Sequence, residues 1–205
     1  MRKFILKFKG GKKEEIFGLT FREALQARIR KNKRLGGAIL KERDLRGVDF
    51  QKCDLADSDF SFSDISGAGF RDANLQSALF QFVKARGAVF TGAKMHFCCL
   101  IEGDFYGAYF NKATLIGAKM SYAAFIGANF FSADLEDAQG TDVCFICANC
   151  MDADFHRAFF TYPCCMKAIF SCANLEDATF HHADFRLAIM EKTNRDGFSD
   201  FKAIY

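Results

Sequence analysis

A five-residue period runs without interruption through most of the chain and restricts the folds that the chain can adopt. At the 31 positions between 40 and 190 whose numbers are multiples of five, 27 residues are Phe, Leu, Ile or Met. Two residues before each of them lies a second column, in which 21 of 31 members are Ala. The residue between the two is often Asp or Asn, as in Ala-Asn-Leu at 73–75. A period held over so many units is typical of a repeat architecture.

The order of residue types within one unit predicts a short strand followed by a corner. In an extended chain, residues two apart point the same way, so the small and the large residue face one side and Asp or Asn faces the other. The remaining two residues are rich in Gly, Ser, Asp and Lys, which suits a turn. Repeated in one rotational sense, such units wind the chain into a solenoid with Ala, Phe and Leu inside.

Residues of the same type recur every twenty positions, which predicts that four units complete one coil. Phe50, Phe70, Phe90 and Phe110 form one such series, and Gly47 begins a glycine series that marks a corner requiring positive φ. Thirty-one units on four sides give nearly eight coils, a column roughly 37 Å tall. We name the sides by their large residues: Phe60 for side one, Ile65 for side two, Phe70 for side three and Leu75 for side four.

The pattern of Ala, then Asp or Asn, then Leu or Phe, then two free residues resembles the pentapeptide-repeat family, over residues 38–190. The resemblance implies an all-β solenoid, a right-handed quadrilateral parallel β-helix. Family members that resemble a DNA duplex and occupy the DNA groove of gyrase are strongly acidic overall, whereas this chain has a formal net charge of +3.

The period divides the chain into three segments. Residues 1–35 are predicted to form a basic amino-terminal hairpin and helix that cap the solenoid, and residues 36–190 form the solenoid itself. Residues 191–205 have apolar residues at helical spacing and are predicted to be a short cap or a dimerisation tail. The hairpin is predicted from the alternation of apolar and basic residues at 3–9, a turn at Gly10-Gly11 and a second strand at 12–17. Thr20 and Glu23 have capping-box spacing before a helix that ends near Lys31. Pro163, the only proline, is expected to remove a ladder donor and make side two irregular.

Charge is unevenly distributed along the sequence. Residues 1–46 carry a net charge of +10 and the remainder carries −7, which together give +3. The basic segment is a candidate for direct nucleic-acid binding, an interpretation that we consider less favoured than protein binding. Its candidate residues are Lys12, Lys13, Arg28, Arg30, Lys31, Lys33 and Arg34.

No catalytic, cofactor-binding or metal-binding residues are predicted, and an enzyme is not expected. Cys53, Cys98, Cys150 and Cys165 fall in inward columns and are expected to be reduced packing residues. His96, His156, His181 and His182 are interpreted as solvated surface without a matched carboxylate arrangement. No apolar run is long enough to span a membrane. The basic N-terminal segment contains too few consecutive apolar residues for a signal peptide, so we expect a cytoplasmic protein.

Two outward surfaces are candidates for function. The acidic side lies on side four of the later coils and comprises Asp134, Glu136, Asp137, Asp154, Glu176 and Asp177. These residues are either an ordinary polar surface or a surface that mimics the charge of a nucleic acid. The other surface is apolar, and contiguous apolar patches usually mark interfaces. We call it the apolar seam: Phe82, Ile101, Tyr106, Tyr122, Ile126, Ile146, Tyr162 and Met166.

The sequence therefore favours a non-enzymatic protein-binding module whose partner it does not identify. The alternatives are a DNA-mimicking modulator of a DNA-binding enzyme such as a topoisomerase, and direct nucleic-acid binding through the basic segment. A homodimer formed through the C-terminal residues is a further alternative.

Overall fold

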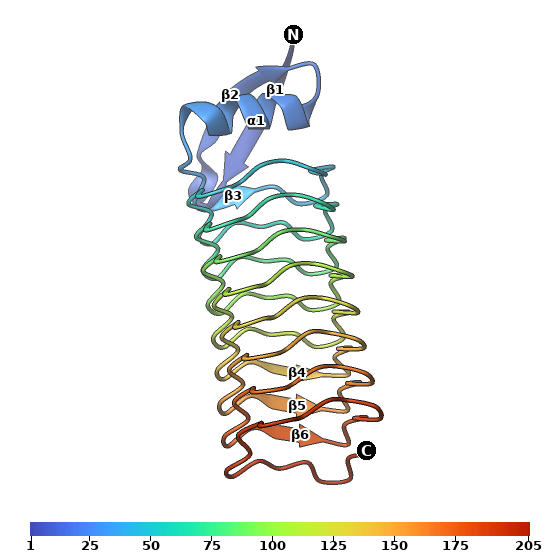
Figure 1. Cartoon of the computed structure of the whole chain (residues 1–205). Helices are drawn as coiled ribbons and strands as arrows, with labels where there is room; N and C mark the ends of the chain where they lie inside the picture. The colour runs from blue at the N-terminus through green and yellow to red at the C-terminus, as the bar shows by residue number, and fades with distance from the viewer.

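Parallel backbone pairing at a fixed interval of twenty residues organises the molecule, whose computed structural model describes residues 1–205. Isolated bridges begin at Arg34↔Asp54 and continue to Asp184↔Ile204, and each joins residues twenty apart, which is the predicted spacing. We call each twenty-residue segment between paired residues a layer. The layers follow one another down a tall stack, with the N-terminal elements at its upper end (Figure 1).

Within the stack, most strands are only one paired residue long because a turn begins on either side. The longer elements are β3 (Ala38–Ile39), β4 (Gln139–Thr141), β5 (Phe159–Thr161) and β6 (Thr179–His181). The last three form a parallel sheet in which Gly140, Phe160 and Phe180 are in register.

Each corner is a turn with a left-handed residue at a fixed place. The N–H of Cys53 donates to the carbonyl of Phe50 at 3.0 Å, and Lys52 between them has φ of +58°. A positive φ at this position is what a type II turn requires. The glycine series beginning at Gly47 has positive φ, as predicted, but 25 non-glycine residues share that conformation. All four corners therefore impose it, which the sequence pattern did not indicate.

Stacked phenylalanines fill the interior. The rings of Phe90, Phe110 and Phe130 follow one another at centroid distances of 4.8 and 4.9 Å, and all three are fully buried. Where the large column contains Gly140, Val143 occupies the freed space, since a Cβ at residue 140 would lie 2.5 Å from Val143 Cγ2. The core is thus continuous despite the exceptions in the pattern.

The N-terminal segment comprises β1 (Arg2–Phe8), the 3-10 turn η1 (Lys9–Gly11), β2 (Lys13–Gly18) and α1 (Phe21–Lys31). Thr20 caps the helix by accepting a hydrogen bond from the N–H of Glu23 at 3.1 Å. β1 pairs antiparallel with β2 and also with β3, which joins the hairpin to the first layer. No helix of the chain is both long and apolar enough to cross a membrane.

Side chains of α1 satisfy backbone groups at the upper edge of the stack. The N–H of Asp49 donates to Gln26 Oε1 at 2.8 Å, and Gln26 Nε2 donates to the carbonyl of Asp49 at 3.2 Å. One layer later, the N–H of Gly69 instead donates to the carbonyl of Val48. The Gln26 amide therefore replaces a missing neighbouring strand, and it covers an edge that would otherwise be open to pairing.

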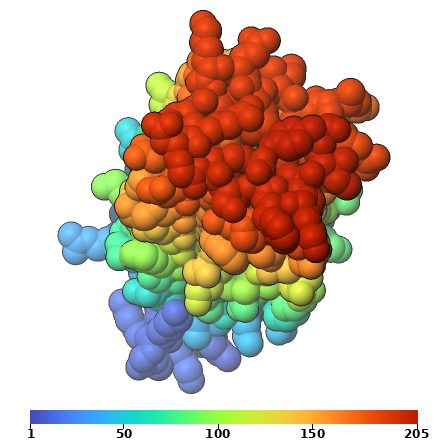
Figure 2. Space-filling model, turned by 90° about the horizontal axis from the view of Figure 1, so that it is seen from below, coloured from blue at the N-terminus to red at the C-terminus, as the bar shows by residue number.

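The C-terminal segment differs from the prediction. Repeat pairing does not stop at Met190, since Asn194, Ser199 and Ile204 pair with residues one layer earlier, and residues 191–205 contain no helix. The large column there includes Arg195 and Asp200, neither of which is buried. Figure 2 looks onto this end, where the last residues form the face. Whether residues 191–205 act as a cap or a dimerisation surface stays a prediction.

The expectation for Pro163 was wrong in its detail. In this repeat the small-column N–H donates to the carbonyl three residues earlier within the turn, as Ala173 does to Phe170, and not to a neighbouring layer. Pro163 therefore removes a turn hydrogen bond, while its carbonyl still accepts from the N–H of Asp184 at 3.0 Å. The corner before Pro163 is extended as β5, but the equivalent corners before Val143 and Ala183 are extended as β4 and β6, so the proline is not required for this conformation.

Candidate functional site

The apolar seam lies along side two, where layer stacking brings residues twenty apart next to one another. The bridges Asp104↔Ala124, Ala124↔Cys144 and Cys144↔Cys164 run through the middle of this side. One margin of the side carries a continuous apolar column, which comprises Tyr106, Ile126, Ile146 and Met166. The other margin carries Tyr122 and Tyr162.

Ion pairs close the seam at both ends. At the upper end, Arg86 lies over the ring of Tyr106 at 6.0 Å and pairs with Asp104 at 2.6 Å. At the lower end, Arg186 donates to Met166 Sδ at 3.5 Å and pairs with Asp184 at 2.7 Å. The apolar strip between them is therefore bounded, with charged residues as a rim, as in protein interfaces.

The sequence interpretation missed the centre of this surface. Ala124, Cys144 and Cys164 occupy the outward middle column of side two, where other layers carry Asp or Lys. All three are uncharged, so no salt bridge separates the two margins of the strip. Spacing by twenty, applied to the middle column, was the signal available in the sequence.

Several seam aromatics adopt a backbone conformation that is costly for large side chains. Tyr122 and Tyr162 have φ of +62° and +55°, and their side chains are 58% and 55% exposed. The left-handed conformation costs about 1–2 kcal/mol for a residue with a Cβ, and other corners place Gly there. Tyr162 stacks on the ring of His182, one layer later, at 4.6 Å, which offsets part of this cost.

Two of the predicted seam residues lie outside the strip. Phe82 stacks on Phe62 at 4.8 Å, and Glu102 lies between Phe82 and Tyr122 in the same corner column. Ile101 lines a shallow hollow on side one together with Lys119, Ser121, Gln139 and Phe159. The other six seam residues lie on the two margins of side two, although Asp142 lies between Tyr122 and Tyr162 in their corner column.

The acidic side is partly neutralised by one arginine. Arg157 pairs with Asp137 at 2.9 Å and also with Glu136. Asp134 and Asp154 pair one layer apart, and Asn174 donates from Nδ2 to Asp154 Oδ1 at 3.0 Å. The six predicted carboxylates thus lie in neighbouring columns of side four, and Arg157 neutralises part of their charge.

The pKa of Asp134 is raised above its ordinary value, first because the carboxyl is partly buried and then because Asp154 and Glu136 lie nearby. At neutral pH the ionised Asp134 carboxylate therefore lowers the stability of the folded state.

We expect Asp134→Asn to raise the melting temperature at pH 7, because an amide keeps the Oδ1 bond from the N–H of Glu136 (3.0 Å) without the charge. The folded-state pKa lies above the unfolded value, so the wild type recovers this stability as pH falls and Asp134 protonates. The advantage of the variant should therefore shrink in melts at acidic pH. A variant that is less stable at pH 7 would contradict the expectation.

The prediction that His156 has no matched carboxylates is wrong. One ligand atom from each of His156, Glu176 and Asp177 can be chosen so that all three lie within 4.8 Å of one another. The residues are twenty and twenty-one apart in sequence, so only layer stacking brings them together. The other histidines differ: His96 and His181 have hydrogen-bond contacts to Thr114 and Ser199.

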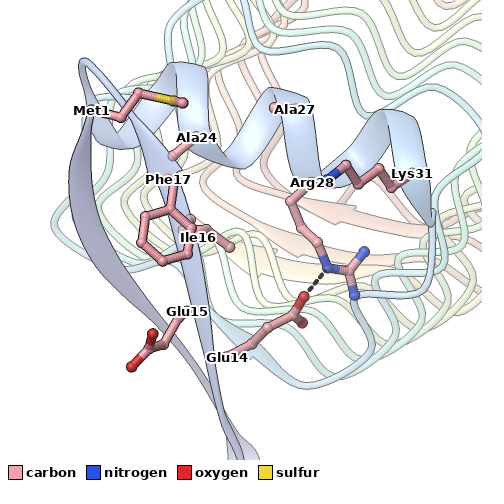
Figure 3. A pocket seen from close by; sticks show the side chains of 9 residues that line it. All are labelled: Met1, Glu14, Glu15, Ile16, Phe17, Ala24, Ala27, Arg28 and Lys31. Carbon is pink, nitrogen blue, oxygen red and sulfur yellow. Dashed lines mark hydrogen bonds and ion pairs between the residues drawn. The ribbon is translucent and has the colours of Figure 1, made fainter.

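Some of the basic candidate residues stabilise the cap. Arg28 pairs with Glu14 at 2.5 Å and Lys33 donates to the carbonyl of Gln51 at 2.7 Å. Lys12 lies over the ring of Phe8 at 5.1 Å, whereas Lys13, Arg30, Lys31 and Arg34 are exposed. Figure 3 shows Arg28 and Lys31 beside a groove of about 460 Å³ between β2 and α1. The candidate basic surface is thus smaller than the sequence count indicates.

All nine cysteines are free thiols. The four inward ones are buried, and burial raises the pKa of Cys53 to about 11 and that of Cys98, Cys150 and Cys165 further. Thiols held protonated in this way are poor nucleophiles and poor metal ligands.

Comparison with known proteins gives one family. A family model described as pentapeptide repeats matches in 8 copies, over residues 34–72, 44–81, 68–107, 108–139 and 167–197. No curated protein matches the chain.

Among solved structures, the chain is similar to HetL from the cyanobacterium Nostoc sp. strain PCC 7120, a pentapeptide repeat protein involved in heterocyst differentiation regulation. The identity is 18%, the match covers 89% of this chain and 95% of that chain, and the TM-score is 0.48. It is also similar to trypsin-treated QnrB1, a plasmid-mediated fluoroquinolone resistance protein, with 18% identity, 83% of each chain covered and a TM-score of 0.46. A pentapeptide repeat protein from the Arabidopsis thaliana thylakoid lumen is 29% identical, covering 58% of this chain and 69% of that chain, with a TM-score of 0.36.

Proposed function

Because the chain belongs to the pentapeptide-repeat family, we propose that it is a non-enzymatic binding protein that presents side two of a right-handed, four-sided β-helix to a protein partner. In this proposal the layers from residue 34 to the C-terminus are the coils of that helix, and the segment before them is its cap. A solenoid of this kind offers a long surface held by contacts between neighbouring repeats.

The single observation that carries the proposal is the apolar strip on side two, in which the stacked column of Tyr106, Ile126, Ile146 and Met166 lies beside the uncharged middle column of Ala124, Cys144 and Cys164. Tyr122 and Tyr162 add little core packing, occupy a conformation that favours glycine, and flank an uncharged strip. Tyrosine supplies a large apolar area together with a hydrogen-bonding hydroxyl, which suits it to the centre of a protein interface. Burial in the core does not account for these two tyrosines, because both residues are more than half exposed.

The test is a triple variant, Tyr122→Ser, Ile126→Ser and Ile146→Ser, used in affinity pull-down from the source cells and in sedimentation of the purified chain. We expect the variant to fold and to recover a specific partner at least tenfold less well, a loss of about 1.4 kcal/mol or more. A matched control, Phe97→Ser, Tyr109→Ser and Phe159→Ser, removes exposed aromatics outside the seam and should leave recovery unchanged. Equal recovery by both variants would contradict the proposal.

Three alternatives predict different outcomes. The stacked carboxylates of Asp134 and Asp154 favour mimicry of DNA charge, for which inhibition of a topoisomerase should depend on these residues and not on the seam. A homodimer through residues 191–205 would appear in sedimentation as a doubled mass that the seam variant retains. Direct nucleic-acid binding would appear as a salt-dependent gel shift that requires Arg30 and Lys31.

A further inference from the structure

We infer that His156, Glu176 and Asp177 form a binding site for a divalent transition-metal cation such as Zn²⁺ or Co²⁺, which links two neighbouring layers at a corner of side four. This site is separate from the seam and does not depend on the proposed function.

Backbone pairing positions the three ligands. The bridge Asp154↔Asn174 aligns the two layers, and the N–H of Arg157 donates to the carbonyl of Glu176 at 3.0 Å. His156 therefore occupies the position one layer before Glu176, and Asp177 follows at the corner. Their ligand atoms lie within 4.8 Å of one another. A cation with bonds of about 2.0–2.2 Å needs them roughly 3–3.5 Å apart, so small side-chain rotations are sufficient.

The donor atoms are free to bind. Arg157, the cation beside the cluster, is already engaged with Asp137 and Glu136, and neither Glu176 nor Asp177 takes part in a salt bridge. The only side-chain hydrogen bond to the Glu176 carboxylate is a long one, from Asn194 Nδ2 to Oε2 at 3.4 Å.

The neighbouring layer leaves room for the third ligand. Gly197 lies one layer beyond Asp177, and a Cβ at that position would be 2.1 Å from Asp177 Oδ1. The absence of a side chain at residue 197 therefore permits the observed position of the Asp177 carboxylate.

The ligand types determine which cation would bind. An imidazole with two carboxylates suits Zn²⁺, Co²⁺ or Ni²⁺, whereas Mg²⁺ and Ca²⁺ prefer oxygen ligands throughout. Three protein ligands leave at least one coordination position for water or for a group from a partner. Because His156 and the two carboxylates come from different layers, a bound cation cross-links the later part of the stack and should raise its resistance to unfolding.

The test is titration of the purified full chain with Co²⁺ and with Zn²⁺, followed by absorbance, calorimetry and thermal melts. We expect one equivalent to bind, no thiolate-to-cobalt charge-transfer band, a higher melting temperature with the cation, and no comparable effect of Mg²⁺. The variants His156→Gln, Glu176→Gln and Asp177→Asn nearly preserve side-chain shape, and each should weaken binding at least tenfold.

His96→Gln is the matched control, because His96 lies in the same column but has Ile116 and Gly117 where His156 has the two carboxylates. It should bind like the wild type. Binding that survives in the combined triple variant, a thiolate band in the wild-type cobalt spectrum, or no binding by the wild type at millimolar cation would each overturn the assignment.

Discussion

Replacing Phe110 by Ala should lower the free energy of unfolding by roughly 3–5 kcal/mol, measured by thermal and denaturant melts. The ring stacks between Phe90 and Phe130 and also contacts Phe105 and Phe125 edge-on at 5.7 and 5.8 Å. It is fully buried in the middle of the stack, so layers on both sides lose contacts when it is removed. Each layer can be stabilised only by its neighbours, and a cavity here therefore interrupts the core along its length.

The control for this prediction is Lys112→Ala, two residues along the same turn. Lys112 is exposed and has φ of +55°, a conformation that Lys and Ala tolerate equally poorly. Its replacement should change the free energy of unfolding by no more than about 0.5 kcal/mol. Small and equal effects of the two variants would show that the inward column has been misassigned.

Replacing Arg28 by Ala should lower the free energy of unfolding of the cap by about 2–3 kcal/mol, because three charged hydrogen bonds from one side chain are lost together. Arg28 Nε donates to Glu14 at 2.5 Å, and its other nitrogens donate to the carbonyls of Asn32 and Arg34 at 2.5 and 3.3 Å. Its side chain is 12% exposed, and Figure 3 shows it reaching from α1 to β2. The residue thus ties hairpin, helix and first layer together.

Two comparisons make the Arg28 prediction specific. Arg28→Lys keeps the charge but not the planar fork and should be intermediate in stability. Arg30→Ala removes an exposed charge from the same helix and should be neutral within about 0.5 kcal/mol. Hydrogen exchange of α1 amides and thermal melts report the difference. If Arg28→Ala leaves both unchanged but weakens DNA binding, Arg28 belongs to a nucleic-acid surface instead.

The sequence by itself determined which residues face inward and which layers are neighbours. Both follow from local rules: alternation along an extended chain places Ala and Phe on one face, and a corner every five residues gives pairing at twenty. The burial of Phe110 and the bridges from residue 34 onward agree with this reasoning. Thr20 and Glu23 similarly marked the start of α1, because a helix cap is made by residues close in sequence.

Only the tertiary structure decided what the outward residues contact. Arg157 could have remained free beside the acidic column, but stacking places it on Asp137 and Glu136, and the same stacking sets His156 against Glu176 and Asp177. Such contacts depend on side-chain conformations and on neighbours a layer away, which the inward pattern leaves unspecified. The extent of the stack was likewise visible only in the structure: Arg195 and Asp200 break the apolar column, yet the backbone beside them still pairs with the preceding layer.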